Sequence, residues 1–205
     1  MRLTLPEVLC VEMPSNPALF PTTLLELPVF ETVAMTEEDR NRASFYVVER
    51  QREALRQRAQ SLEEFLTSLQ LAVTIQLNHE EDIARAAQLT QKTNQFNLTT
   101  RRYASSEIAS MMRDPTYRLY TLRLRDIFGD SGLTALAIVK VEGEEWRIDT
   151  FLMSCRIIGR GIETVFLNEV MADASRSGAK RLWGEYRPTP KNGLVKDFYA
   201  TAGFM

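Results

Sequence analysis

The feature that most constrains the fold is a predicted strand, a glycine turn and a helix that follow one another from Trp146 to Gly178. Two glycines between a strand and a helix permit positive φ and leave the first N–H groups of the helix facing outward. The pattern therefore predicts a diphosphate site, to which Arg156 and Arg160 add positive charge; the alternative is an ordinary strand-to-helix turn. The predicted strand alternates, with one face formed by Trp146, Ile148, Thr150 and Leu152 and the other by Arg147, Asp149, Phe151 and Met153.

Composition excludes several classes of protein. The chain has 205 residues, of which 44% are hydrophobic, enough for one core and a smaller second unit. A net charge of −2 gives no basic field for nucleic acid. We find no apolar run long enough for a membrane and no signal peptide, so we expect a cytoplasmic protein. Cys10, Cys155 and the single His79 suggest neither a disulfide framework nor a metal site nor a histidine-based triad.

A long polar run, residues 91–103, surrounds the single phenylalanine Phe96. So many amides, hydroxyls and guanidiniums suit a site that hydrogen-bonds a polar ligand. The alternative is an ordered loop whose side chains satisfy its own backbone. A second charged stretch, the predicted helix over residues 36–60, has more basic than acidic residues and is either a docking surface for a carrier protein or a solvated face.

From about residue 71 the order is strand, helix, helix, three strands, glycine loop, helix, strand, helix, and this order resembles the GNAT acyltransferases. The end of the chain is similar to that superfamily's closing pattern, with Asn192, Phe198-Tyr199 and Gly203-Phe204. The resemblance implies an α/β (α+β) fold whose mixed, mostly antiparallel sheet is flanked by helices. It also implies coenzyme A or a carrier's phosphopantetheine at the glycine loop, with the pantetheine arm admitted where the strands 146–155 and 180–186 splay apart. The cofactor-binding residues would be Arg156, Ile157, Ile158, Gly159, Arg160, Gly161 and Asn192.

Three longer runs, residues 88–103, 148–156 and 184–192, resemble the FkbH-like proteins, which join a HAD-type domain to a GNAT-like domain. That family is associated with glyceryl transfer from 1,3-bisphosphoglycerate to an acyl carrier protein, for methoxymalonyl-type polyketide extender units. The implied partners are an acyl carrier protein and the HAD-type domain. The implied segments are a HAD remnant over 1–35, a helical arm over 36–70 and a GNAT-like domain over 71–205.

The sequence departs from the FkbH-like pattern at both ends. The Asp-x-Asp-type loop and the acyl-accepting cysteine of the HAD half are missing, and neither Cys10 nor Cys155 lies in such a motif. The sequence also stops at Met205, where a GNAT sheet would add its last one or two strands. We therefore expect a fragment or a truncated gene product.

Within this resemblance, individual side chains acquire expected roles. Tyr199 would protonate the leaving thiolate, or is a core aromatic. Glu185 would act as a base, or is a solvated carboxylate, and Cys155 would carry an acyl group, or is structural. The acyl group or its phosphate would be held by Asn94, Asn97, Arg101 and Arg102.

The expected function is acyl transfer from a pantetheine thioester, in glyceryl or methoxymalonyl carrier-protein formation. One alternative is a carrier-docking module without chemistry that serves a HAD-type partner. Another is a stand-alone N-acetyltransferase that uses acetyl-CoA. The absence of acidic residues from positions 94–102 argues against an amine acceptor.

Overall fold

The structure is a computed structural model that describes residues 11–27 and 42–205, except for the side chains of residues 42–46. The chain divides into two compact units, Met1–Val47 and Val48–Met205. The described part of the first unit holds a short 3-10 turn, η1 (Pro17–Leu19), and the helix α1 (Phe20–Leu25), neither of which buries a residue. Cys10 lies outside the described residues, and the predicted divisions at residues 35 and 70 remain predictions.

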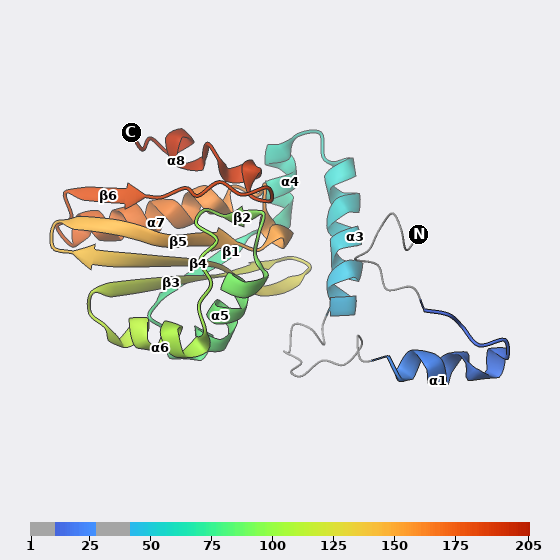
Figure 1. Ribbon diagram of the computed structural model, residues 1–205. Coiled ribbons are helices and arrows are strands. Elements are labelled where there is room, and N and C mark those ends of the chain that lie inside the picture. Colours follow the sequence, from blue (N-terminus) through green and yellow to red (C-terminus); the bar gives the residue numbers. More distant parts are fainter. Residues whose placement is uncertain (1–10, 28–41) are drawn as a thin grey trace. The chain divides into compact units, whose positions relative to one another are not determined.

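The second unit is built on a six-stranded sheet, seen across its face in Figure 1. Its long strands are β1 (Ala72–Leu77), β3 (Tyr117–Asp126), β4 (Gly129–Glu142) and β5 (Glu145–Met153), which are paired antiparallel in the order β1-β3-β4-β5. The outer edge of β5 has two partners: β6 (Arg181–Gly184), which is parallel, and β2 (Phe96–Asn97), which is antiparallel. The predicted mixed, mostly antiparallel sheet is thereby confirmed.

Helices cover both faces of this sheet, as Figure 1 shows. On one face α5 (Ile83–Lys92) and α6 (Ser105–Arg113) pack on a cluster that includes Leu119, Leu136 and Ile138. On the other face α7 (Ile162–Arg176) packs on a cluster that includes Leu122, Phe151 and Phe166. Three further helices, α3 (Arg42–Arg58), α4 (Leu62–Leu69) and α8 (Phe198–Thr201), complete the described helices longer than a 3-10 turn. The central strand β4 is buried on both faces, which explains its nearly continuous apolar sequence.

A β-bulge in β5 changes which side chains face the core. Thr150 pairs with Ile138 and Ile148 with Val139, so Asp149 has no partner in β4. The extra residue shifts the alternation, because successive residues in a strand point to opposite faces. Trp146 and Ile148 therefore lie on the α7 face together with Phe151 and Met153, while Leu152 lies on the opposite face. The predicted strict alternation is wrong beyond Asp149.

An ion pair joins α7 to the sheet near the C-terminal end of the helix, away from the glycine turn. The carboxylate of Asp173 accepts hydrogen bonds from Tyr120 Oη and from the Arg118 guanidinium, which lies 4.8 Å from the ring centroid of Trp146. Burial works to raise the pKa of Asp173, but these hydrogen bonds and the charges of Arg118 and Arg176 outweigh it and lower the pKa below its usual value.

This contact predicts an acid-sensitive part of the stability. The folded-state pKa of Asp173 lies below its unfolded value, so its stabilisation is complete above the unfolded pKa and is lost as the pH falls through the folded value. The stabilisation is about 1.4 kcal/mol for each unit by which the pKa is lowered. We expect Asp173→Asn to lower the free energy of urea unfolding at pH 7 and to lose less of it than the parent between pH 4 and pH 2. Parallel pH curves for the two proteins would contradict this.

Candidate functional site

The glycine loop connects β5 to α7. After Met153 the chain makes a 3-10 turn, η4 (Cys155–Ile157), and then passes Gly159 and Gly161 before α7 begins at Ile162. Both glycines have positive φ, 79° and 73°, a region that glycine adopts without steric cost. The predicted succession of strand, glycine turn and helix is confirmed.

The backbone of this loop presents a row of N–H groups. In the described part of the chain, no acceptor faces the N–H groups from Ile158 to Thr164; the next, on Val165, donates to Gly161 O at 3.4 Å. These groups lie at the N-terminus of a 15-residue helix, where the helix dipole favours negative charge. The loop backbone has the geometry of an anion site.

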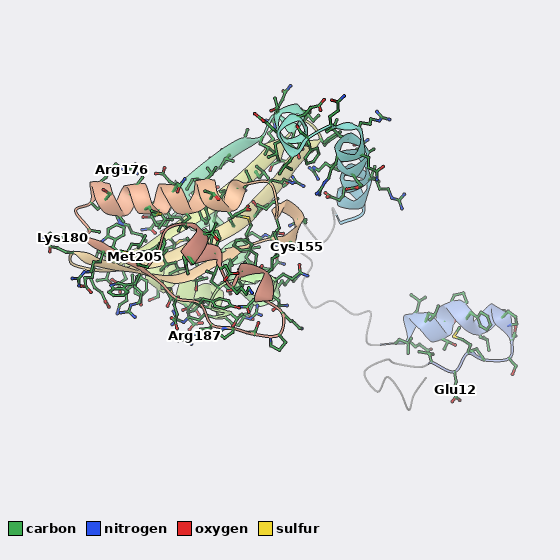
Figure 2. The ribbon with its side chains drawn as sticks, turned by 90° about the horizontal axis from the view of Figure 1, so that it is seen from above. Glu12, Cys155, Arg176, Lys180, Arg187 and Met205 are labelled. Atoms are coloured by element: carbon green, nitrogen blue, oxygen red, sulfur yellow. The ribbon has the colours of Figure 1, made fainter. Side chains whose placement is uncertain are left out.

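The side chains of the loop point in different directions. Ile157 is fully buried, and Cys155 is exposed near the start of α7, at the opposite end from Arg176 (Figure 2). Arg156 Nε donates to Ser154 Oγ at 3.3 Å. Arg160 is only 8% exposed, so its guanidinium is not at the outer face of the loop where the sequence placed it. Its contribution to an anion site would come through its backbone N–H.

The polar run 91–103 does not form an open binding surface, because its middle completes the sheet. Phe96 pairs with Met153, Leu98 N donates to Phe151 O at 3.1 Å, and Leu98 O accepts from Arg187 N at 2.8 Å. The pairing of β5 with β6 ends at Ile148 and Gly184, as expected. Residues 96–98, however, lie in the gap between them that was expected to admit a pantetheine arm. The physical reason is that Phe96 and Leu98 are almost completely buried there.

Two asparagines that were expected to bind ligands hold this loop together. Asn97 is fully buried, donates to Thr93 O and accepts from Thr100 N. Asn192 is also fully buried, and its Nδ2 donates to Asn97 O and Arg187 O, both at 2.9 Å. Asn192 Oδ1 also accepts from Thr189 N at 2.7 Å, so both donors and the oxygen of Asn192 are engaged, while Asn97 uses one donor and its oxygen.

The other three residues that were predicted to hold the acyl group, Asn94, Arg101 and Arg102, differ in what they contact. Arg102 donates to Thr90 O, Thr93 O and Asn94 Oδ1, so it and Asn94 serve the backbone and side chains around the same run. Arg101 instead reaches across to the sheet. The alternative interpretation, an ordered loop that satisfies its own backbone, describes three of the four residues.

Arg101 belongs to a charged cluster at the bulge of β5. Its guanidinium binds the carboxylate of Asp149 and, at 2.9 Å, that of Glu185; Tyr103 Oη donates to Asp149 Oδ2 at 2.6 Å. Arg187 also binds Glu185. The hydrogen bond from Arg187, with the charges of Arg101 and Arg187, lowers the pKa of Glu185 despite its partial burial. Glu185 is therefore a weak proton acceptor.

This cluster brings together the three sequence runs that carry the FkbH-like resemblance. Residues 88–103 contribute Arg101 and Tyr103, residues 148–156 contribute Asp149, and residues 184–192 contribute Glu185 and Arg187. Sequence reasoning did not select Tyr103, Asp149 or Arg187 individually, although each lies inside one of those runs.

Tyr199 is a buried tyrosine with an unpaired hydroxyl. It is 8% exposed, and its Oη has no hydrogen-bond partner in the described part of the chain. Burial, followed by the negative charge of Glu185, raises its pKa above the usual value. Its ring lies on Gly184, where a Cβ would be 2.7 Å from Tyr199 Cζ. Nothing in the sequence indicated that Gly184 makes room for this ring.

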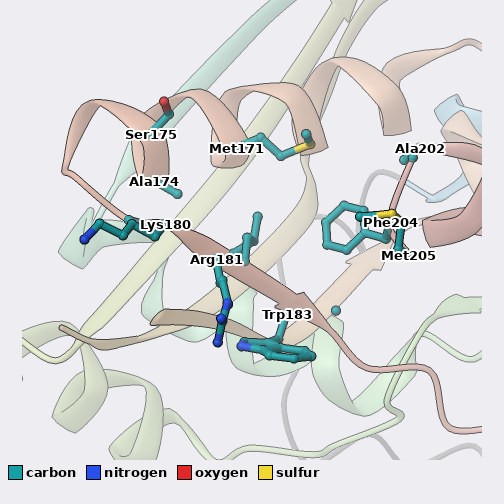
Figure 3. A pocket seen from close by; sticks show the side chains of 13 residues that line it. Met171, Ala174, Ser175, Lys180, Arg181, Trp183, Ala202, Phe204 and Met205 are labelled. Carbon is teal, nitrogen blue, oxygen red and sulfur yellow. The ribbon is translucent and has the colours of Figure 1, made fainter. Parts of the chain in front are cut away.

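A cavity of about 510 Å³ lies between β6, α7 and the last residues of the chain (Figure 3). Its lining is mainly apolar and includes Met171, Leu182 and Phe204. No residue of the predicted site lines this cavity.

Comparison of the structure with solved structures identifies the fold. The ribosomal-protein-S18-alanine N-acetyltransferase from Escherichia coli aligns with a TM-score of 0.52 and 19% identity, over 65% of this chain and 78% of that chain. Ard1 from Thermoplasma volcanium aligns with a TM-score of 0.51 and 18% identity, over 65% and 83%. The protein has the GNAT acetyltransferase fold. No protein-family model and no curated protein matches the sequence.

The described residues lack two kinds of feature. None of the helices they form is long and apolar enough to cross a membrane. Within the same residues, no group of three or more histidine, cysteine or acidic side chains is arranged to hold a metal ion.

Proposed function

We propose that the protein is an acyltransferase that binds coenzyme A, or the phosphopantetheine of a carrier protein, at the glycine loop. The observation that carries this proposal is the row of N–H groups from Ile158 to Thr164 at the start of α7, for which the described residues supply no acceptor. Backbone N–H groups at a helix N-terminus bind phosphate without needing a cationic side chain. The fold supports the proposal, because the solved structure from Escherichia coli that shares it is an N-acetyltransferase.

In the proposed reaction, a nucleophile on the acceptor attacks the thioester carbonyl. The new bond forms to the acyl carbon, the carbon–sulfur bond breaks, and the thiolate takes a proton from Tyr199. The nucleophile gives its own proton to water, and water returns a proton to Tyr199. The phenol is protonated at neutral pH, as an acid must be, although burial raises its pKa and so makes it a weaker proton donor. Its Oη is buried and has no hydrogen-bond partner among the described residues, so it has a hydrogen bond to offer to a thiolate that reaches it. We assign Cys155, which is exposed near this loop, as an alternative attachment point for an acyl group.

The FkbH-like runs extend the proposal to a particular substrate class, a glyceryl or methoxymalonyl-type group on an acyl carrier protein. The support is that these separated runs meet in one cluster around Asp149. An N-acetyltransferase that uses acetyl-CoA is the simpler form of the same chemistry and agrees with the fold. Turnover with acetyl-CoA and an amine, but with no carrier-bound substrate, would favour this form.

A second candidate function is docking of a carrier protein without chemistry. It is favoured by residues 96–98, which lie between β5 and the chain after β6. A pantetheine arm in that gap would have to displace the buried side chains of Phe96 and Leu98.

Calorimetric titration with coenzyme A and with a phosphopantetheine-loaded carrier protein tests both candidates. We expect Gly161→Val to weaken binding of coenzyme A at least about tenfold, because valine strains a backbone with φ of 73°. Gly178→Val is the matched control, since it places the same strain at the other end of α7, where φ is 82°.

The outcomes separate the candidates. Loss of binding in Gly161→Val alone supports the anion site, and equal losses in both variants would attribute the effect to the helix. Binding of the carrier that Gly161→Val leaves unchanged, without binding of coenzyme A, would favour docking. No binding of either would remove both candidates. Where turnover is found, unchanged turnover in Tyr199→Phe would exclude Tyr199 as the acid.

A further inference from the structure

Three buried charged side chains and the exposed Glu49 form a cluster next to the glycine loop. Arg52 of α3 binds Asp126, at the end of β3, through Nε at 2.7 Å and Nη2 at 3.0 Å. Arg160 Nη1 lies 3.5 Å from Asp126 Oδ2. Glu49 lies 3.2 Å from Arg52 and 3.7 Å from Arg160. Both arginines and Asp126 are more than nine-tenths buried.

Arg160 links this cluster to the loop itself. Its Nη2 donates to the carbonyl oxygen of Arg156 at 2.9 Å, so the side chain closes the loop on itself while its other nitrogen faces Asp126. Arg160 stands between Gly159 and Gly161, and glycine gives a backbone the greatest conformational freedom. The anchored guanidinium of Arg160 therefore restrains a loop segment that the two flanking glycines would otherwise leave flexible.

Building on the proposed function, we propose that Asp126 is a positioning residue for the anion-binding loop. By holding Arg160 inward, it keeps the backbone from residue 158 to 164 in the conformation that presents its N–H groups outward. Arg52 holds Asp126 from the other side, so α3 acts on the loop through this carboxylate.

The proposal and simple electrostatics predict opposite effects on binding affinity when the charge of Asp126 is removed. Asp126 is an anion near a site for a diphosphate, so removing its charge should strengthen binding if charge alone matters. If Asp126 instead positions the loop, removing its charge should weaken binding. Asp126→Asn keeps the size of the side chain and an oxygen that accepts from Phe128 N, but it removes the charge and replaces the other acceptor oxygen by an NH2 donor that cannot accept from the arginines.

The experiment compares the affinities for coenzyme A and for pantetheine, which lacks the phosphates. We expect Asp126→Asn to weaken binding of coenzyme A at least about tenfold relative to pantetheine. Asp130→Asn is the matched control, because it removes the same charge from the same β-hairpin, and among the described residues its carboxylate accepts from Gly132 N alone. Tighter binding by Asp126→Asn, or an equal change in both variants, would overturn the proposal.

Arg160→Lys is the second variant and serves if Asp126→Asn does not fold. It keeps the charge but cannot reach both Arg156 O and Asp126 with a rigid fork. We expect it to lose the preference for coenzyme A over pantetheine, and a retained preference would overturn the proposal. If the parent protein shows no such preference, the proposed anion site fails. If the parent shows it and the variants keep it, the positioning role alone fails.

Discussion

Replacing Phe151 by alanine is expected to lower the free energy of unfolding by about 3–5 kcal/mol. Phe151 is fully buried directly after the bulge of β5. Its ring centroid lies 5.3 Å from that of Phe166 on α7, 5.2 Å from that of Phe198 on α8 and 6.3 Å from that of Phe96 on β2. One side chain thus contacts three elements that are far apart in sequence.

Urea unfolding monitored by circular dichroism measures this effect. Leu194→Ala is a suitable control, because Leu194 is 65% exposed and its truncation should cost less than about 0.5 kcal/mol. The aromatic contacts also predict that Phe151→Ala loosens β2, so that amide hydrogen exchange at Leu98 becomes faster. A loss below 1 kcal/mol would mean that these aromatic rings do not form a common core.

The sheet could be predicted because its strands carry strong local signals, and its irregularities could not. The apolar run from Leu133 to Val141 requires cover on both faces, and β4 has it. The bulge at Asp149 has no local signal, because one extra residue leaves the composition of the strand unchanged and only the pairing with β4 reveals it. The two-residue strand β2 was missed because Phe96 stands among amides and hydroxyls that indicated a polar loop.

In the candidate site, the backbone conformation could be predicted from the sequence, but the directions of the side chains could not. Glycine spacing predicted the loop, because positive φ at Gly159 and Gly161 is a local requirement. The direction of Arg160 is not local, since it depends on Asp126, which lies 34 residues earlier in the chain. Asn97 and Asn192 were likewise expected to face a ligand, and instead they satisfy loop backbone that a sequence alone does not bring together.

Replacing Arg52 by methionine is expected to cost about 3–5 kcal/mol of stability, because it leaves a buried carboxylate without its closest cation. The side chain of Asp126 is completely buried, and Arg52 supplies both of its short charge-assisted bonds. Burial works to lower the pKa of Arg52, but its hydrogen bonds and the charges of Asp126 and Glu49 raise it, so the guanidinium stays charged.

Two further variants show whether the charge or the geometry of Arg52 matters. Arg52→Lys keeps the charge but cannot make two parallel bonds to one carboxylate, so we expect a smaller loss of about 1–2 kcal/mol. Arg56→Met, one turn further along α3 at an exposed position, should change stability by less than about 0.5 kcal/mol. Equal losses for Arg52→Met and Arg56→Met, measured by urea unfolding, would show that the cluster adds nothing to stability. If stability instead rises in the order Arg52→Met, Arg52→Lys, parent protein, the guanidinium fork of Arg52 holds α3 to the end of β3, beside the glycine loop.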